Sequence, residues 1–185
     1  MSRFTSKRLI TATALVALLG TAAYASSVHL KGGPNSKPAF TDLMLTLRTT
    51  GALAGLGFGD VLVGLSATAN ATATCSNGAN HQPPGQNPAP ITVSGSEAIP
   101  ASEVQNGNVS FSVTTNPPVT PIPGAPGCPN SKNWTEDITD LSFTSATITV
   151  QQGTPLATVL TVTCMFSPAT TDGPVPSGTV SCTSS

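Results

Sequence analysis

The stretch VLVGLSATANATATC, which spans residues 61–75, decides the fold class of this chain. Apolar residues occupy every second position from Val61 to Cys75, and serine, threonine and asparagine fill most of the positions between them. A period of two places one set of side chains on each face of an extended strand. The stretch therefore predicts one long strand with a buried and a solvated face. Because it is much longer than a typical strand of about 5–6 residues, we expect a bulge or a switch between sheets near Ala69.

Shorter stretches with the same alternation flank this strand. They predict strands at residues 28–30, 43–48, 91–93, 109–113, 141–150, 160–166 and 180–182. A change of parity near Ser145 indicates another bulge. Turns are expected at residues 51–60, 100–108 and 152–154, and proline-rich loops at residues 76–90 and 116–130. The pattern predicts an all-β domain, a single antiparallel β-sandwich of Ig-like architecture with about 7–8 strands.

The amino terminus has the order of a secretory signal. Arg3, Lys7 and Arg8 precede a largely apolar run at residues 9–22, which ends at the small-residue pattern Ala23-Tyr24-Ala25. A membrane anchor is the weaker alternative, because a span needs about 20 apolar residues and three threonines interrupt this run. We therefore expect a signal helix at residues 1–25 that is cleaved near Ala25, an extended leader at residues 26–38 and a sandwich domain at residues 39–185. No transmembrane segment is predicted in the mature chain, which is secreted or held at the cell surface, with the periplasm as an alternative.

Charge disfavours two classes of partner. Cleavage removes three of the seven basic residues and leaves Lys31, Lys37, Arg48 and Lys132. Against eight acidic residues, the mature chain has a net charge of 4 − 8 = −4. Nucleic acids and anionic lipids are bound through clustered Lys and Arg, and no such cluster remains.

Four cysteines in an exported chain predict two disulfides. Of the three pairings, strand parity favours Cys75 with Cys128 and Cys164 with Cys182. A zinc site is disfavoured because no pair has C-x-x-C spacing and the mature chain has only two histidines, His29 and His81. In the chain-entropy model, the bridge over about fifty residues from Cys75 to Cys128 contributes about 4 kcal/mol to stability.

The candidates for chemistry are few. Glu136, Asp137 and Asp140 form the densest acidic cluster and are a weak candidate for calcium, with a solvated acidic turn as the alternative. Trp134 beside them is a candidate sugar contact, with burial in the core as the alternative. The sequence contains no G-x-S-x-G motif, and the glycines at residues 55, 57 and 59 lack the pattern of a phosphate loop. We predict no catalytic residue and no cofactor.

These observations predict a non-enzymatic exported protein that acts as a structural or surface subunit or as a protein-binding module. Its partner is expected to be a protein or a second copy, because the long loops on a rigid sandwich are where binding residues lie. In self-assembly, residues 26–38 would be the donated strand. The alternatives are a carbohydrate-binding module centred on Trp134 and the nearby acids, and a hydrolase with carboxylates from distant strands.

Overall fold

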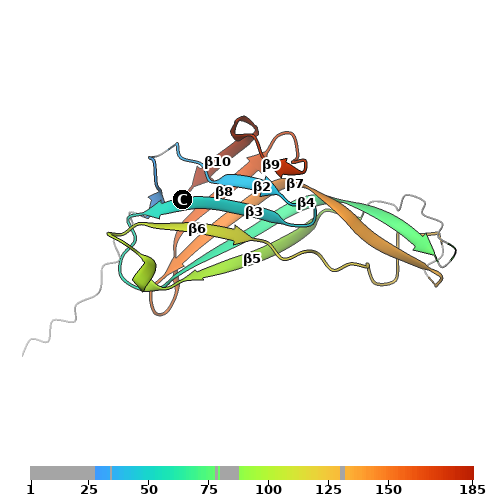
Figure 1. Cartoon of the computed structure of the whole chain (residues 1–185), viewed down its shortest axis with the longest axis horizontal. Coiled ribbons are helices and arrows are strands. Elements are labelled where there is room, and N and C mark those ends of the chain that lie inside the picture. Colours follow the sequence, from blue (N-terminus) through green and yellow to red (C-terminus); the bar gives the residue numbers. More distant parts are fainter. Residues whose placement is uncertain (1–27, 34, 78, 80–87, 130–131) are drawn as a thin grey trace, which may run out of the picture.

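The computed structural model describes residues 28–33, 35–77, 79, 88–129 and 132–185. The predicted signal at residues 1–25 lies outside these residues. Two antiparallel sheets pack face to face into an elongated β-sandwich (Figure 1), and no α-helix occurs among the described residues. The predicted all-β class is confirmed.

Sheet A is built around β3 (Leu47–Ala54). One edge of β3 pairs with β6 (Val109–Thr114). The other edge pairs with β2 (Ala39–Asp42) and, farther along, with β1 (His29–Leu30). A two-residue strand, β9 (Gly173–Pro174), follows outside β2. The leader segment is therefore part of the fold, since β1 pairs with β3 of its own chain.

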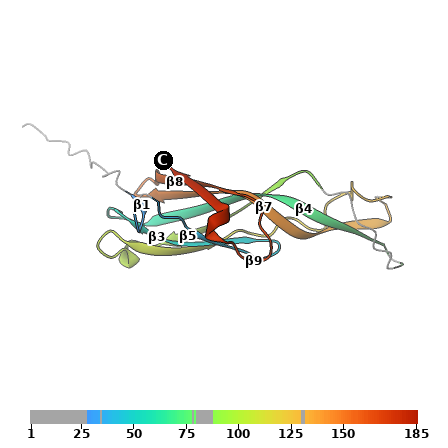
Figure 2. The same cartoon turned by 90° about the horizontal axis from the view of Figure 1, so that it is seen from above.

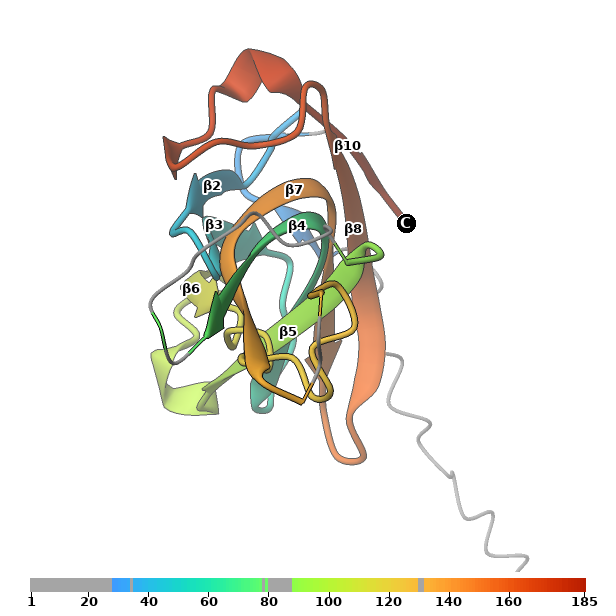
Figure 3. The same ribbon diagram turned by 90° about the vertical axis from the view of Figure 1, so that its right-hand side faces the viewer.

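Sheet B contains the longer strands. Its order is β10 (Val180–Ser184), β8 (Ala157–Phe166), β7 (Trp134–Gln152), β4 (Val61–Asn77) and β5 (Ile91–Ile99). Two short 3-10 helices, η1 (Ala101–Glu103) and η2 (Ser177–Thr179), precede β6 and β10. Figure 3 shows the two layers from the end of the molecule.

The core lies between the inner faces of the two sheets. Alternate residues of β4 from Val61 to Cys75 are buried, as the period of two predicts, and those from Val61 to Ala71 belong to this core. They meet Leu47 and Leu53 of β3, which are fully buried. On its outer face, sheet B carries rows of hydroxyl side chains, one of which runs through Ser94, Ser66, Thr147, Thr163 and Thr183. On this face, hydroxyl groups rather than charged groups are available to bind water.

The ends of β4 and β7 project beyond the other strands as a two-stranded arm, formed by residues 70–77 and 134–142 (Figures 1 and 2). Pairing of β4 with β5 ends at Ala69, and pairing of β7 with β8 ends at Ser145. The register shifts between Thr68 and Ala69 and again between Thr72 and Ala73. The expected bulge near Ala69 is confirmed, and it is the same irregularity as the parity change near Ser145 in β7.

The proline-rich loop after β6 lies along the arm. A disulfide joins Cys128 in this loop to Cys75 near the end of β4, and a second disulfide joins Cys164 of β8 to Cys182 of β10. These are the two pairings that strand parity favours. Both are typical of proteins in an oxidising compartment outside the cytosol.

The predicted strand at residues 43–48 is wrong. Leu43 and Leu45 belong to a hairpin turn, because β2 ends at Asp42 and β3 begins only at Leu47. Leu43 donates its backbone N–H to the carbonyl of Thr46, and Met44 adopts a positive φ of 67°. The predicted turn at residues 51–60 also begins too early, since β3 continues to Ala54.

The described residues form ten strands rather than the predicted 7–8. The difference arises from β2 and β9, which were not predicted: β2 has four residues and β9 two, and such short strands show no clear period in the sequence.

Candidate functional site

The structure separates the residues that the sequence analysis had placed in one acidic cluster. Glu136 is 1% exposed, and its carboxylate accepts a hydrogen bond of 2.9 Å from the backbone N–H of Gly127. The backbone carbonyl of Glu136 accepts another from Ile122. Glu136 therefore fastens the proline-rich loop to the arm, which is a structural role.

The neighbouring candidates face other surroundings. The Asp137 carboxylate accepts a hydrogen bond of 3.5 Å from the Thr120 hydroxyl, and Trp134 is half-buried at the end of the arm. Asp140 lies at the base of the arm, where one carboxylate oxygen is buried and has no hydrogen-bond partner in the structure. Among the described residues, no three His, Cys, Asp or Glu side chains are placed to hold a metal ion.

A buried carboxyl network connects sheet A to the base of the arm. Asp42, at the end of β2, is 2% exposed and accepts hydrogen bonds from the Thr170 hydroxyl and from the backbone N–H of Met44. Thr170 also accepts a hydrogen bond of 2.9 Å from the backbone N–H of Phe143 in β7 and donates its own N–H to the Phe143 carbonyl. Thr170 is therefore hydrogen-bonded to the edge of β7 just beyond the point where β8 stops pairing with it.

Burial raises the pKa of Asp42 from 3.8 to about 6, and the negative charges of Asp140 and Asp172 add to the increase. The hydrogen bonds from Thr170 and Met44 oppose it. Because Asp42 and Thr170 are buried and bonded to each other, we assign this network to the stability of the fold.

The most exposed apolar side chain lies at the opposite end of the molecule from the arm. Three connections meet there: residues 55–60 between β3 and β4, residues 100–108 between β5 and β6, and residues 153–156 between β7 and β8. We call this surface the loop end. Phe58 projects from the loop end and is fully exposed, with a relative accessibility of 101%. Leu156, in the connection between β7 and β8, is 47% exposed. Isolated exposed apolar residues are common, but a fully exposed phenylalanine is not.

The turn that carries Phe58 is held rigidly. The buried side chain of Gln152 accepts a hydrogen bond of 3.0 Å from the backbone N–H of Gly57 and donates one of 2.9 Å to the Gly57 carbonyl. The Asp60 carboxylate accepts one of 2.9 Å from the N–H of Ala101, so the first two connections are joined. Because of these bonds, Phe58 is presented on an ordered turn rather than on a loose loop.

Two largely apolar hollows lie at the loop end, and Phe58 lines one of them. One, of about 360 Å³, is lined by Leu56, Ala101 and Val104 together with Phe58 itself. The other, of about 330 Å³, is lined by Val61, Leu62, Ala98, Pro155 and Leu156, among others. The loop end therefore has an apolar projection with apolar depressions next to it.

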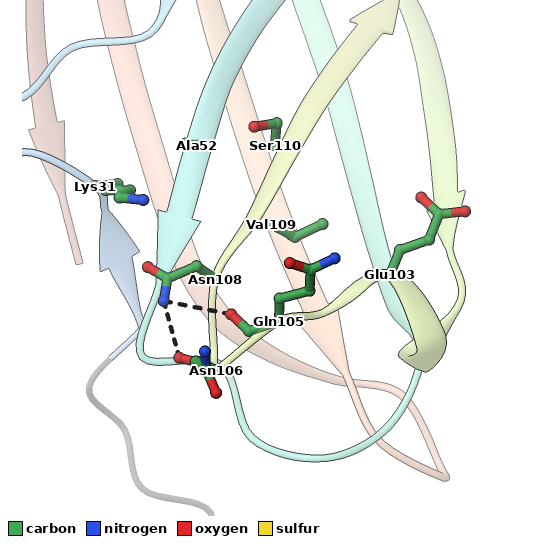
Figure 4. A pocket seen from close by; sticks show the side chains of 8 residues that line it. All are labelled: Lys31, Ala52, Glu103, Gln105, Asn106, Asn108, Val109 and Ser110. Carbon is green, nitrogen blue, oxygen red and sulfur yellow. Dashed lines mark hydrogen bonds between the residues drawn. The ribbon is translucent and has the colours of Figure 1, made fainter.

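A polar hollow of about 410 Å³ adjoins the loop end on the outer face of sheet A (Figure 4). It is formed around the turn at Asn106 and Gly107, whose φ angles of 51° and 73° fit a type I′ hairpin turn. The Asn108 amide donates hydrogen bonds to the carbonyls of Gln105 and Asn106, as the dashed lines show. The turn predicted at residues 100–108 is confirmed, but the hollow beside it was not predicted.

The sequence contained one signal for the loop end. In the segment LGFGD, residues 56–60, a large apolar residue stands between two glycines in a turn, where no burial is expected. The polar hollow had no such signal, because it combines Lys31 after β1 with residues from β3, the β5–β6 connection and β6.

Comparisons with known proteins gave no match: no family model, no curated protein and no solved structure is similar to this chain. Its function is therefore inferred from its own residues. Among the described residues, no helix is long and apolar enough to cross a membrane.

Proposed function

We propose that this protein is an exported, non-enzymatic β-sandwich of Ig-like architecture that acts as a surface or structural subunit and binds a second copy of itself through the loop end. Export is supported by the signal-like sequence of residues 1–25 and by the two disulfides. The observation that carries the proposal is the full exposure of Phe58 on a rigid turn. Aromatic residues held in this way are typical anchors of protein interfaces.

The loop end carries both a projection, Phe58, and a hollow that could receive one. A two-fold contact uses the same surface on both copies, so Phe58 of each copy would enter the hollow beside Phe58 of the other. The hollow of about 360 Å³ is lined by Leu56 and Val104, which would cover the ring with apolar atoms. Burial of one phenylalanine contributes about 1.5–3 kcal/mol, so two rings supply about 3–6 kcal/mol. Because association costs at least about 4 kcal/mol, the surrounding contacts must add to this gain, and the dimer is expected to be weak.

The mass of residues 26–185 in solution, measured by light scattering across a concentration series, tests this proposal. We expect the wild-type mass to rise toward that of a dimer, and Phe58→Ser to stay monomeric at every concentration. Met165→Ser is the matched control, because Met165 is 55% exposed on the outer face of sheet B, away from the loop end. A wild-type monomer throughout, or a Phe58→Ser dimer, would contradict the proposal.

A further inference from the structure

The polar hollow on sheet A has an arrangement of charges that the proposed self-association does not use. Lys31 follows β1 at one side of it, and Glu103 lies in η1 at the other side (Figure 4). Both side chains are exposed, and in the part of the chain that the structure describes no ion pair joins them. A positive and a negative group therefore border the same depression from opposite sides.

Neutral hydrogen-bonding groups lie between the two charges. Gln105, Asn108 and Ser110 contribute amide and hydroxyl groups that can donate and accept. The Asn108 amide is held by its hydrogen bonds within the turn, so part of this lining is already ordered. Ala52 and Val109 add small apolar surfaces to the lining.

Hydrogen bonds attach the elements on both sides of the hollow to the rest of the fold. The N–H of Lys31 donates a hydrogen bond of 2.8 Å to the carbonyl of Ala52, which attaches the end of β1 to β3. Ala52 pairs in turn with Ser110 of β6. On the other side, the Asp60 carboxylate anchors the start of η1 through Ala101. Lys31 is thus carried by a segment attached to sheet A, and Glu103 by a short helix attached to the connection between β3 and β4.

We propose that this hollow binds a small zwitterion, a molecule with a carboxylate and an ammonium group joined by a short polar backbone, such as a free dipeptide. The carboxylate would face Lys31, the ammonium group would face Glu103, and the peptide group between them would meet the amides of Gln105 and Asn108. The volume of about 410 Å³ accommodates a ligand of this size. A ligand with a single charge would leave one of the two charged side chains without a partner.

Glycylglycine is a suitable probe, and its binding is followed from the backbone amide signals of isotope-labelled protein, residues 26–185, by NMR. We expect saturable shifts at Lys31 and at residues 103–110 with a dissociation constant in the millimolar range, about −4 kcal/mol. The same measurements on Phe58→Ser separate ligand binding from self-association, since that variant keeps the hollow. The fingerprint spectrum also reports whether each variant is folded.

Two singly charged analogues test the assignment of each end. N-acetylglycylglycine carries only the carboxylate, and its affinity should fall about threefold to fivefold in Lys31→Gln but not in Glu103→Gln. Glycylglycinamide carries only the ammonium group and should show the opposite dependence. Lys132→Gln and Asp172→Asn change charge elsewhere and should bind glycylglycine like the wild type.

The proposal would be overturned by the absence of saturable shifts in the hollow up to about 0.1 M glycylglycine, a hundredfold above a millimolar dissociation constant. Equal binding of uncharged N-acetylglycinamide would also overturn it, because the charges would then have no role. Neither result depends on whether the protein forms a dimer.

Discussion

The hydroxyl of Thr170 donates a hydrogen bond to the buried carboxylate of Asp42, although 128 residues separate them in the sequence. The bond joins the end of β2 in sheet A to the segment after β8, and Thr170 is bonded on its other side to Phe143 of β7. Asp42 thus sits where the two sheets and the base of the arm meet, close to the negative charges of Asp140 and Asp172.

This position makes the stability of the protein depend on pH. The pKa of Asp42 is about 6 in the folded chain and 3.8 as its ordinary value, so the folded state holds this proton more tightly than the unfolded chain does. The contribution of Asp42 is therefore most favourable below pH 3.8 and is lost as the pH rises through about 6. From the difference between these two pKa values, the loss of unfolding free energy is at most about 3 kcal/mol.

Urea unfolding of residues 26–185 at a series of pH values between about 4 and 7 measures this effect. We expect the wild-type free energy of unfolding to fall relative to that of Asp42→Asn as the pH rises. Asp172→Asn should reduce the difference, because it removes one charge that raises the pKa of Asp42. Parallel pH profiles for the wild type and Asp42→Asn would refute the assignment.

Removal of the Thr170 hydroxyl should destabilise the protein much more than removal of an exposed threonine hydroxyl. In Thr170→Val, the Asp42 carboxylate loses a donor and the Phe143 N–H loses its side-chain acceptor, both in buried surroundings. We expect a loss of about 2–4 kcal/mol at neutral pH. Thr163→Val on the outer face of sheet B is the matched control and should change stability by less than about 0.5 kcal/mol. Equal stabilities of the two variants in urea would show that the network contributes little.

The disulfide between Cys75 and Cys128 should control the environment of the only tryptophan. Trp134 is half-buried at the end of the arm, and the adjacent Thr135 carbonyl lies 3.7 Å from the sulfur of Cys128. Once the loop is released in the double variant Cys75→Ala/Cys128→Ala, we expect a red-shifted Trp134 emission and stronger quenching by acrylamide. Cys164→Ala/Cys182→Ala removes the other disulfide, far from the indole, and should leave the emission of the folded protein unchanged. Identical quenching in all three proteins would show that the loop does not cover the indole.

Features of the fold that depend on neighbouring residues can be predicted from the sequence, and features that depend on contacts between distant residues cannot. The alternation in residues 61–75 predicts the long strand and its bulge because a period of two is a local property of the chain. The leucines at residues 43, 45 and 47 misled for the same reason, since nothing local shows that Leu43 is exposed in a turn. The end of β2 is instead stabilised by the Asp42–Thr170 contact, which no local pattern reveals.

The candidate sites show the same limit. Acids that are close in sequence on β7 alternate in direction or are displaced by the second bulge, so Glu136 and Asp140 reach different surroundings. Conversely, Lys31 and Glu103 are far apart in sequence and border one hollow. Prediction of that hollow would have required the pairing of β1 with β3 and of β3 with β6.

Two glycines of sheet B provide a sharp test of how closely its edge approaches sheet A. A Cβ atom added at Gly95 in β5 would lie 2.0 Å from the carbonyl oxygen of Thr114 in β6, whereas one added at Gly64 in β4 would have its nearest neighbour at 3.8 Å. The obstacle at Gly95 is backbone, which cannot rotate away, and the adjacent residue Ser94 accepts a hydrogen bond of 2.8 Å from Asn116. Gly95→Ala must therefore push the two sheets apart at this edge.

We expect Gly95→Ala to lower the free energy of unfolding by about 3 kcal/mol, at the upper end of the usual cost of overpacking. Gly64→Ala should be neutral or stabilise by up to about 1 kcal/mol, because alanine restricts the unfolded chain and meets only ordinary contacts in the folded one. Urea denaturation of both variants beside the wild type makes the comparison. If Gly95→Ala were as stable as Gly64→Ala, β5 would have to lie farther from β6 than the structure places it.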